Sequence, residues 1–264
     1  MLHEVPPMRV AAAGESLIRA DTPARPRALA VLDGLLSGRA WADDPANPRA
    51  VLVMEDADGT VYGGGALTAE ALRSALEGVA TKSGDLIFGL ASSDDPMRAM
   101  VPAEPYWRGD ALDFTDRVPP ADEDRLVPQD LPDGVRVVRL DASLLPLTEW
   151  YEDTLHAFGS AERWEELGLG YAVMIGDRMV AEAMAGPRCR RLLEMGVVTR
   201  EDHRRRGFGT LVSRLTARAC EERGDRVWWN ANADNAPSLA IARRIGFRHE
   251  RRYDLVACHA PLRA

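Results

Sequence analysis

The spacing of apolar residues in the C-terminal half of the chain predicts an alternating order of strands and helices. Helical spacing begins at Phe208, continues to Ala219 and ends at Gly224. A second helix is predicted over residues 235–246, because Asn235 is a favourable N-cap and Pro237 follows in the first turn. The other expected elements are a strand at 135–140, helical sequence at 144–158, strands at 171–175 and 179–185 that form a hairpin, strands at 192–199 and 226–232, and a last strand around 253–256.

The N-terminal half has an α+β pattern of its own. A strand is predicted at residues 50–54, and residues 61–62 form its hairpin partner after an Asp-Gly turn. A helix over about residues 68–79 and a third strand at residues 86–90 follow.

The segment between the two halves is rich in proline and acidic residues and poor in apolar ones, which is typical of a linker. We therefore expect an N-terminal domain at residues 1–118, a linker at 119–134 and a C-terminal domain at 135–264. The full fold is expected to be α/β (α+β).

Residues 197–210 join a β-branched strand to the helix that begins near Phe208. Gly207 and Gly209 have no Cβ, so backbone N–H groups there can approach an anion. The helix dipole and the guanidinium groups of Arg204, Arg205 and Arg206 favour negative charge at the same place. The segment therefore predicts a diphosphate-binding turn, and the alternative is a tight strand-to-helix connection with three solvated arginines.

This turn and the capped helix downstream of it together resemble the GNAT superfamily of acyl-CoA-dependent N-acyltransferases. The resemblance covers about residues 134–258, from the Arg-x-x-Gly-x-Gly motif to Asn235, Ser238 and Gly246-Phe247. Residues 194–199 and 229–232 are most similar to the group of zwittermicin A resistance acetyltransferases. The resemblance implies a mixed, splayed central sheet flanked by helices, with acetyl-CoA (coenzyme A) as the cofactor.

The resemblance also assigns residues to the cofactor. Backbone groups of Val197 and Thr199 would bind the pantetheine arm, and the thioester would lie between the strands at 192–199 and 226–232. Backbone amides from Arg205 to Thr210 would hold the pyrophosphate. The implied cofactor-binding residues are Val197, Val198, Thr199, Arg204, Arg205, Arg206, Gly207, Phe208, Gly209, Thr210, Asn232, Asn235 and Ser238.

One departure from the family pattern concerns the general acid. Many members have a tyrosine three residues after the serine, where its hydroxyl can protonate the leaving thiolate, and this chain has Ile241 there. Loss of such an acid removes about 10²-fold in rate if no other group replaces it. Ser238, Tyr253 or water could take its place.

Glu194 is the candidate general base that removes a proton from the acceptor amine. It interrupts an apolar strand beside the cofactor segment, and partial burial would raise the pKa of its carboxyl group toward a useful value. The alternative is an outward-facing strand residue or an ion-pair partner of Arg190 or Arg191.

The resemblance to the GNAT superfamily implies that the segment joining the first and second strands of the catalytic domain carries the acceptor pocket. That segment holds the candidate substrate-binding residues Trp150, Glu152, Asp153 and His156, whose aromatic and acidic groups suit a cationic amine. An amphipathic helix with a solvated acidic face is the alternative. In the N-terminal half, residues 63–65 are three glycines without a basic cluster, so a strand end with close backbone packing is preferred there over a second cofactor site. The order of elements in that half resembles the first half of a GNAT module, so we expect residues 1–118 to form a degenerate GNAT-like α+β domain that shapes or covers the acceptor site.

Composition narrows the classes of partner. A net charge of −8 argues against broad nucleic-acid binding, and no apolar run is long enough for a membrane helix. The three cysteines show no metal-binding spacing and are odd in number, so we expect reduced thiols and no bound metal. We also expect a cytoplasmic protein that is a monomer or homodimer. The expected function is acetyl transfer to a small-molecule amine acceptor; a catalytically weak acyl-CoA-binding regulatory module and a nucleotide or nucleic-acid binder are the alternatives.

Overall fold

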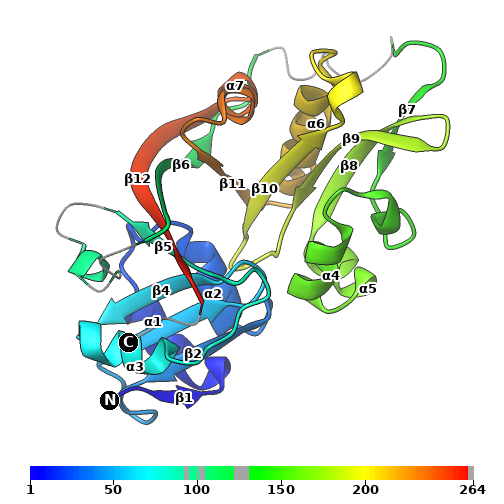
Figure 1. Ribbon diagram of the computed structural model, residues 1–264. Helices are drawn as coiled ribbons and strands as arrows, with labels where there is room; N and C mark the ends of the chain where they lie inside the picture. The colour runs from blue at the N-terminus through cyan, green and yellow to red at the C-terminus, as the bar shows by residue number, and fades with distance from the viewer. Residues whose placement is uncertain (92–94, 100, 102–104, 122–130, 261–264) are drawn as a thin grey trace. The chain divides into compact units, whose positions relative to one another are not determined.

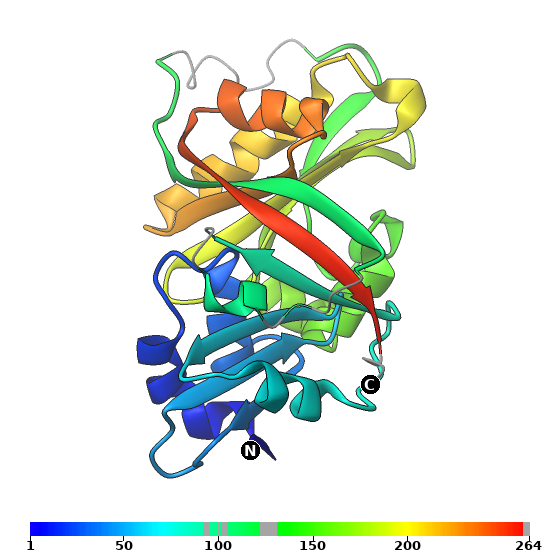
Figure 2. The same ribbon diagram turned by 60° about the vertical axis from the view of Figure 1, so that its left-hand side comes forward.

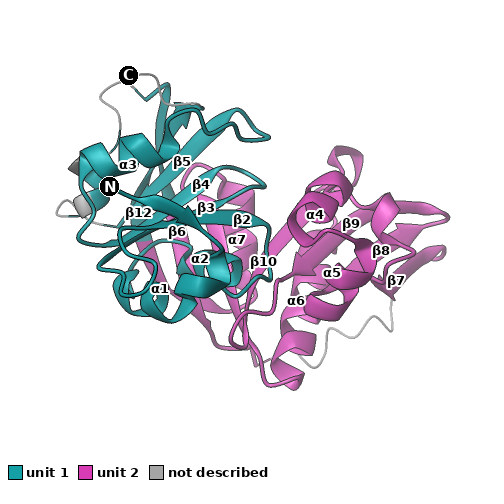
Figure 3. Cartoon of the chain, turned by 90° about the horizontal axis from the view of Figure 1, so that it is seen from below, with its two compact units in different colours: residues 1–111, 252–264 teal, residues 112–251 magenta. Residues whose placement is uncertain are grey.

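The computed structural model describes residues 1–91, 95–99, 101, 105–121 and 131–260, and it divides the chain into two compact units (Figures 1 and 3). Unit 1 comprises residues 1–111 and 252–264, and unit 2 comprises residues 112–251. Most of the predicted linker, residues 122–130, lies outside the described residues. The division into domains at 1–118 and 135–264 therefore stays a prediction.

Two long strands pass from one unit into the other. They are β6 (Trp107–Arg117) and β12 (Phe247–His259), which are neighbours in the strand order and can be followed in Figure 2. The sequence predicted only a short last strand around residues 253–256 and did not predict β6. Glycine and three aspartates interrupt the apolar pattern of β6 and conceal it.

Unit 1 has the strand order β1-β2-β3-β4-β5-β12-β6, with its own parts of the last two strands. The predicted strands, hairpin and helix are confirmed, since β3 pairs antiparallel with β4, and β4 pairs parallel with β5. Thr68 caps the helix by accepting a hydrogen bond from the Ala71 amide. The elements are β1 (His3–Val5), α1 (Ala11–Leu17), α2 (Arg25–Leu32), β2 (Gly38–Ala42), β3 (Ala50–Glu55), β4 (Thr60–Gly65), α3 (Ala69–Leu76) and β5 (Asp85–Leu90), with 3-10 turns at Pro7–Val10 and Pro96–Ala99.

Unit 2 has the strand order β12-β6-β11-β10-β9-β8-β7. Strands β7 to β10 pair antiparallel in sequence, and β10 pairs parallel with β11. The remaining elements are β7 (Val135–Arg139), α4 (Tyr151–Phe158), α5 (Ala161–Leu167), β8 (Leu169–Ile175), β9 (Arg178–Ala185), β10 (Leu192–Thr199), α6 (Phe208–Glu222), β11 (Arg226–Asn232) and α7 (Ala236–Arg244), with 3-10 turns at Leu145–Leu147 and Glu201–His203.

Helices cover both faces of the unit 2 sheet (Figure 1). Phe208 and Val212 of α6 pack on a face that includes Val173 of β8. Trp164 of α5 packs on the opposite face, against Ala172, the next residue along β8. Because successive side chains of a strand point to opposite faces, α5 and α6 lie on opposite sides of the sheet.

The helical sequence predicted over residues 144–158 forms two separate helical pieces. A 3-10 turn at Leu145–Leu147 comes first, Thr148 is extended, and α4 begins only at Tyr151. The side chain of Thr148 donates a hydrogen bond to the Leu145 carbonyl, which replaces a helical backbone bond. The break leaves Trp150 at the N-terminal end of α4, where its ring is free to point at the sheet.

Candidate functional site

The parallel strands β10 and β11 diverge within unit 2. Among the described residues their pairing runs from Leu192–Arg226 to Met195–Trp229 and does not continue along the last residues of either strand. The other edge of β10 stays paired with β9 as far as Thr199. Backbone groups of β10 between Gly196 and Thr199 can therefore face an open gap, as the splayed sheet predicted from the sequence requires.

The turn after β10 has an unusual backbone. A short 3-10 turn at Glu201–His203 leads to Arg204, and then Arg205 and Gly207 adopt positive φ angles of 62° and 81°. Gly207 is the N-cap of α6. A positive φ is readily adopted by glycine, whereas a residue with a Cβ is strained there.

The turn presents unused hydrogen-bond donors. None of the six backbone N–H groups from Arg205 to Thr210 donates a hydrogen bond to another described residue. The last three of these belong to the first turn of α6, which has no intrahelical partner for them. A Cβ built on Gly207 meets no atom within 4 Å, so the space beside these amides is open. This arrangement fits an anion such as a diphosphate.

The three arginines of the turn differ in their contacts. Arg204 donates from Nε to the Thr199 carbonyl at 3.2 Å and so ties the turn to the end of β10. Arg206 lies 2.9 Å from His203 Nδ1 and stacks over the Phe208 ring. Arg205 is exposed and has no partner among the described residues, so its guanidinium is the one best placed to meet a ligand.

Gly209 has a different role from Gly207. Its Cβ position lies 2.9 Å from Thr199 Oγ1 and 3.2 Å from Ile241 Cδ1. A side chain there would push α6 away from β10 and α7. The sequence interpreted both glycines as openings for an anion, and the structure shows that Gly209 allows close packing of the helix.

The downstream helix α7 is capped as the sequence predicted. Asn235 accepts a hydrogen bond from the Ser238 amide at 3.2 Å. The Ser238 hydroxyl accepts one from the Trp229 indole at 3.1 Å, which leaves its own hydrogen available to another acceptor. Asn232 is exposed at the end of β11, and Ile241 lies beside the first turn of α6.

Glu194 and Trp150 lie on the same face of the unit 2 sheet, opposite to α6. Leu193 and Met195 pack in the core with Ala217 of α6, so Glu194 and Gly196 point the other way. Trp150 also lies on that face, because a Cβ on Gly196 would stand 3.0 Å from its ring. Glu194 is half-buried and in register with Trp228.

The other predicted acceptor residues lie on α4. Glu152 and Asp153 are exposed, and His156 is half-buried one turn after Glu152. Their helix begins directly after Trp150, whose ring lies against Gly196 of β10. Contact of these three side chains with an acceptor stays a prediction.

Glu182 of β9 is a candidate functional residue that the sequence reasoning missed. It is 3% exposed and accepts a hydrogen bond from the Glu149 amide at 2.9 Å. Burial raises the pKa of its carboxyl group to about 7. Hydrogen bonds from the Glu149 and Trp150 amides and the positive charge of Arg200 lower this pKa, but by less than burial raises it. The sequence does contain a signal for Glu182, because it is the single carboxylate within the apolar segment 179–185.

Glu182 should make the stability of the protein depend on pH. Because its pKa is raised in the folded state, the folded protein keeps a proton that the unfolded chain has released between about pH 4.5 and pH 7. The free energy of unfolding therefore falls as pH rises through this window. Glu182→Gln removes the effect, so its stability relative to wild type should increase by about 3 kcal/mol from pH 4 to pH 8 in urea titrations.

Glu166→Gln is the matched control for that measurement, because Glu166 is exposed on α5. Its stability relative to wild type should not change between the two pH values. An equal pH response in both variants would show that Glu182 is not the group responsible.

Asp113 of β6 is a second buried carboxylate that the sequence reasoning missed. It is 1% exposed and accepts hydrogen bonds from Trp228 Nε1 at 3.3 Å, Asn230 Nδ2 at 2.7 Å and a terminal guanidinium nitrogen of Arg251 at 3.2 Å. Trp228 is in register with Glu194, so this network lies on the same face of the sheet. It ties β6, β11 and β12 together.

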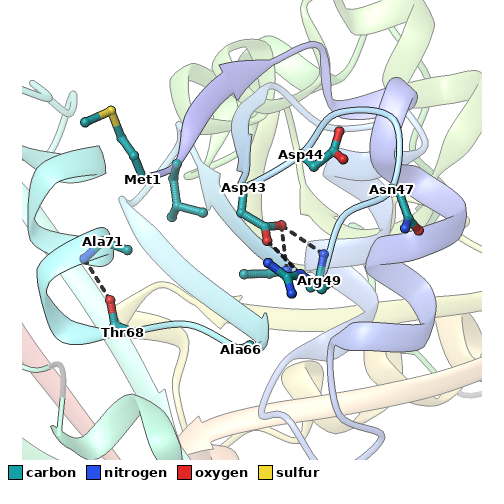
Figure 4. Close-up of a pocket in the computed structure, with 10 residues that line it drawn as sticks. Met1, Asp43, Asp44, Asn47, Arg49, Ala66, Thr68 and Ala71 are labelled. Carbon is teal, nitrogen blue, oxygen red and sulfur yellow. Dashed lines mark hydrogen bonds and ion pairs between the residues drawn. The ribbon is translucent and has the colours of Figure 1, made fainter.

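Described residues of unit 1 line a cavity of about 550 Å³ and a smaller one. The first of these is drawn in Figure 4. Asp43 at its edge accepts hydrogen bonds from the Arg49 and Ala50 amides, both at 2.9 Å, and lies 3.6 Å from Arg49 Nε. Asp43 and Arg49 at this cavity are therefore paired with each other.

The smaller cavity of unit 1, of about 270 Å³, adjoins the three glycines at the end of β4. A Cβ on Gly64 would stand 2.5 Å from the Leu17 carbonyl carbon, and one on Gly65 would clash with the Arg49 carbonyl. These contacts confirm the predicted strand end with close backbone packing.

Among the described residues, no helix is both long and apolar enough to cross a membrane. In the same part of the chain, no three histidine, cysteine or acidic side chains gather as metal ligands would. Cys189, Cys220 and Cys258 are buried and form no disulfide with one another, and burial raises the pKa of the Cys220 thiol to about 12.

Solved structures show the same fold. A GCN5-related N-acetyltransferase-like protein from Streptococcus suis is 21% identical, with a TM-score of 0.64 over 85% of this chain and 90% of that one. A tandem GNAT protein from the clavulanic acid biosynthesis pathway is 14% identical, with a TM-score of 0.58 over 100% of both chains. At these identities the likeness shows the fold alone, and the predicted GNAT fold is confirmed.

Sequence comparison identifies the family as well as the fold. The uncharacterized N-acetyltransferase YdfB of Bacillus subtilis is 24% identical over 127 residues, which are 47% of this chain and 49% of that protein. The match thus spans about half the length of this relative. A family model described as GNAT acetyltransferase matches residues 21–256, which include the turn before α6 and the capped helix α7. The chain therefore belongs to the GNAT acetyltransferase family.

Proposed function

We propose that this protein transfers an acetyl group from acetyl-CoA to the amine of a small molecule, by direct attack in a ternary complex. The observation that carries the proposal is the set of six unused backbone N–H groups from Arg205 to Thr210, beside the point where β10 and β11 diverge. These groups fit a diphosphate, and the gap leaves room for an extended arm along β10.

The proposed cofactor contacts follow from this geometry. The amides from Arg205 to Thr210 and the exposed Arg205 guanidinium would hold the pyrophosphate, while Arg204 holds the turn itself. Residues 197–199 would bind the pantetheine arm, and Asn232, Asn235 and Ser238 would face the end of that arm. Bound acetyl-CoA would supply the thioester that the acceptor amine attacks.

Glu194 is the proposed general base. An alkylammonium must lose a proton before its nitrogen can attack a carbonyl, and a carboxylate is a suitable acceptor. Glu194 lies on the acceptor face, immediately before the last paired residue of β10. In the proposed step Glu194 takes the proton, the nitrogen forms a bond to the acyl carbon, and the carbon–sulfur bond breaks.

Ser238 is the proposed source of the proton for the leaving thiolate. Its oxygen is already an acceptor for the Trp229 indole, which orients the hydroxyl hydrogen away from that bond. The serine hydroxyl is a weaker acid than the phenol of the tyrosine that many family members have three residues later, where this chain has Ile241.

Ile241→Tyr tests whether the missing acid limits the rate. Ile241 lies beside the first turn of α6, so a tyrosine hydroxyl placed there can reach the region of the thiolate. We expect kcat to rise about tenfold with unchanged acetyl-CoA affinity. Ile241→Phe is the control of similar size without the hydroxyl, and an equal gain in both variants would point to packing instead of acid catalysis.

The proposed acceptor is a small cationic amine. Trp150 supplies an aromatic wall beside Gly196, and Glu152, Asp153 and His156 on α4 add polar and acidic groups near it. The sequence similarity to zwittermicin A resistance acetyltransferases favours an amine-bearing antibiotic or metabolite.

The proposal is tested by calorimetric titration with acetyl-CoA and by a thiol assay for CoA release with aminoglycosides, polyamines, amino acids and peptides. Micromolar binding with amine-dependent thiol release is the expected result. Ile241 favours a second candidate, a weakly catalytic acyl-CoA-binding regulatory module, which predicts binding without turnover on any amine. Absence of acetyl-CoA binding would overturn both functions.

A further inference from the structure

Glu182 links the acceptor side of the site to the sheet. On β9 it stands in register with Val198 of β10 and Ala172 of β8, and it is almost fully buried. Its carboxyl group accepts hydrogen bonds from two successive backbone amides, those of Glu149 and Trp150. These two residues come immediately before α4, so one carboxyl group attaches the beginning of that helix to β9.

The attached segment carries the Trp150 ring. That ring rests over Gly196, at 3.0 Å from where a Cβ would stand, and Gly196 is the first residue of β10 beyond its pairing with β11. The ring therefore forms a wall at the point where the proposed thioester gap opens. Displacement of the Glu149–Trp150 backbone would move this wall.

We propose that Glu182 is a positioning residue, whose buried carboxyl group holds the Glu149–Trp150 backbone and thereby the Trp150 wall against β10. The role in acceptor binding rests on the proposed function, whereas the hold itself is a property of unit 2.

The direction of the pH effect follows from linkage. When the Glu149–Trp150 segment lifts, water reaches Glu182 and its ionised form is solvated. Burial raises the pKa of Glu182 to about 7 in the held arrangement, and contact with water returns it toward its ordinary value. The held arrangement is thus favoured below about pH 7 and loses stability as pH rises through that value.

Other charged groups near Glu182 modify this balance. Glu149, which is exposed, opposes ionisation of Glu182, and Arg200, at the end of β10, favours it. The in-register neighbours Ala172 and Val198 are uncharged. On α4, the ionisable side chains are those of Tyr151, Glu152, Asp153 and His156.

Amide hydrogen exchange of residues 148–158, followed by mass spectrometry, tests the hold without an acceptor. After correction for intrinsic exchange, wild-type protection of this segment should fall at least fivefold between pH 6 and pH 8.5. Glu182→Gln cannot ionise, so its protection should stay constant over this range. Glu182→Ala should be poorly protected at both pH values, while peptides from β8 keep wild-type protection in all variants.

Constant wild-type protection between the two pH values, or an equal fall in Glu182→Gln, would overturn the proposal. Acetyl-CoA titration of the same samples shows separately whether the fold and the proposed cofactor site are intact. With the amine that releases most thiol, the ratio of kcat/KM for Glu182→Gln to that for wild type should rise at least threefold from pH 6 to pH 8.5. A flat ratio with pH-dependent exchange would overturn the link to the acceptor and leave acetyl transfer itself unaffected.

Discussion

Replacing Gly207 by aspartate is expected to weaken acetyl-CoA binding about 100-fold, which corresponds to about 2.7 kcal/mol. Gly207 has a φ of 81° and open space where a Cβ would stand, next to the free amides of the first turn of α6. An aspartate there adds backbone strain of about 1 kcal/mol and places a carboxylate where the pyrophosphate would bind. The carboxylate can also occupy the free amides itself.

Gly78→Asp is the matched control for Gly207→Asp. Gly78 has a φ of 73° and no atom within 4 Å of its Cβ position, and it lies in unit 1 after α3. It therefore reproduces the backbone strain and the added charge away from the turn. Calorimetry should give wild-type affinity for Gly78→Asp. If folded Gly207→Asp also binds acetyl-CoA like wild type, the assignment of the pyrophosphate site is wrong.

Replacing Glu194 by glutamine is expected to lower kcat/KM by about 100-fold or more, because the amine loses its proton acceptor. Glutamine has the same shape and cannot accept the proton, so acetyl-CoA affinity should stay unchanged. The residual rate should rise with pH, as more of the free amine becomes neutral in solution. Initial rates between pH 6 and pH 9.5 with the best amine measure both effects.

Two comparisons make the Glu194 result specific. Glu166→Gln, on an exposed surface of α5, should keep wild-type kcat/KM. Glu182→Gln should change kcat/KM in the pH-dependent way expected of a positioning residue, without a 100-fold loss. If Glu182→Gln lost activity and Glu194→Gln did not, the base would have to be assigned to the buried carboxyl group on β9.

Local features of unit 2 could be predicted from the sequence because their determinants are contiguous. The turn before α6 depends on Gly207 and the adjacent arginines, and the start of α7 depends on Asn235 and its hydrogen bond to the Ser238 amide. In unit 1, the helix cap at Thr68 is of the same kind. Short-range hydrogen bonds and backbone preferences act within a few residues, so their pattern is visible in the sequence.

The local sequence pattern did not predict the structure correctly where polar residues interrupt an apolar run. Asp113 concealed β6, yet three donors from β11 and β12 make this buried carboxylate compatible with a strand. The helical spacing of residues 144–158 concealed the break before α4, which Thr148 and the contact of Trp150 with the sheet stabilise. In both places distant partners outweigh local propensity.

The sequence by itself determined the order of the main strands and helices of unit 2, the glycine turn before α6 and the resemblance to the family. Only the tertiary structure decided that Gly209 serves helix packing, that Trp150 covers Gly196 and that Glu182 is buried beneath the Glu149 amide. These features depend on residues far apart in the chain that the sheet brings together. Burial and the pKa of a carboxyl group are properties of such assembled surroundings, so residue type alone cannot specify them.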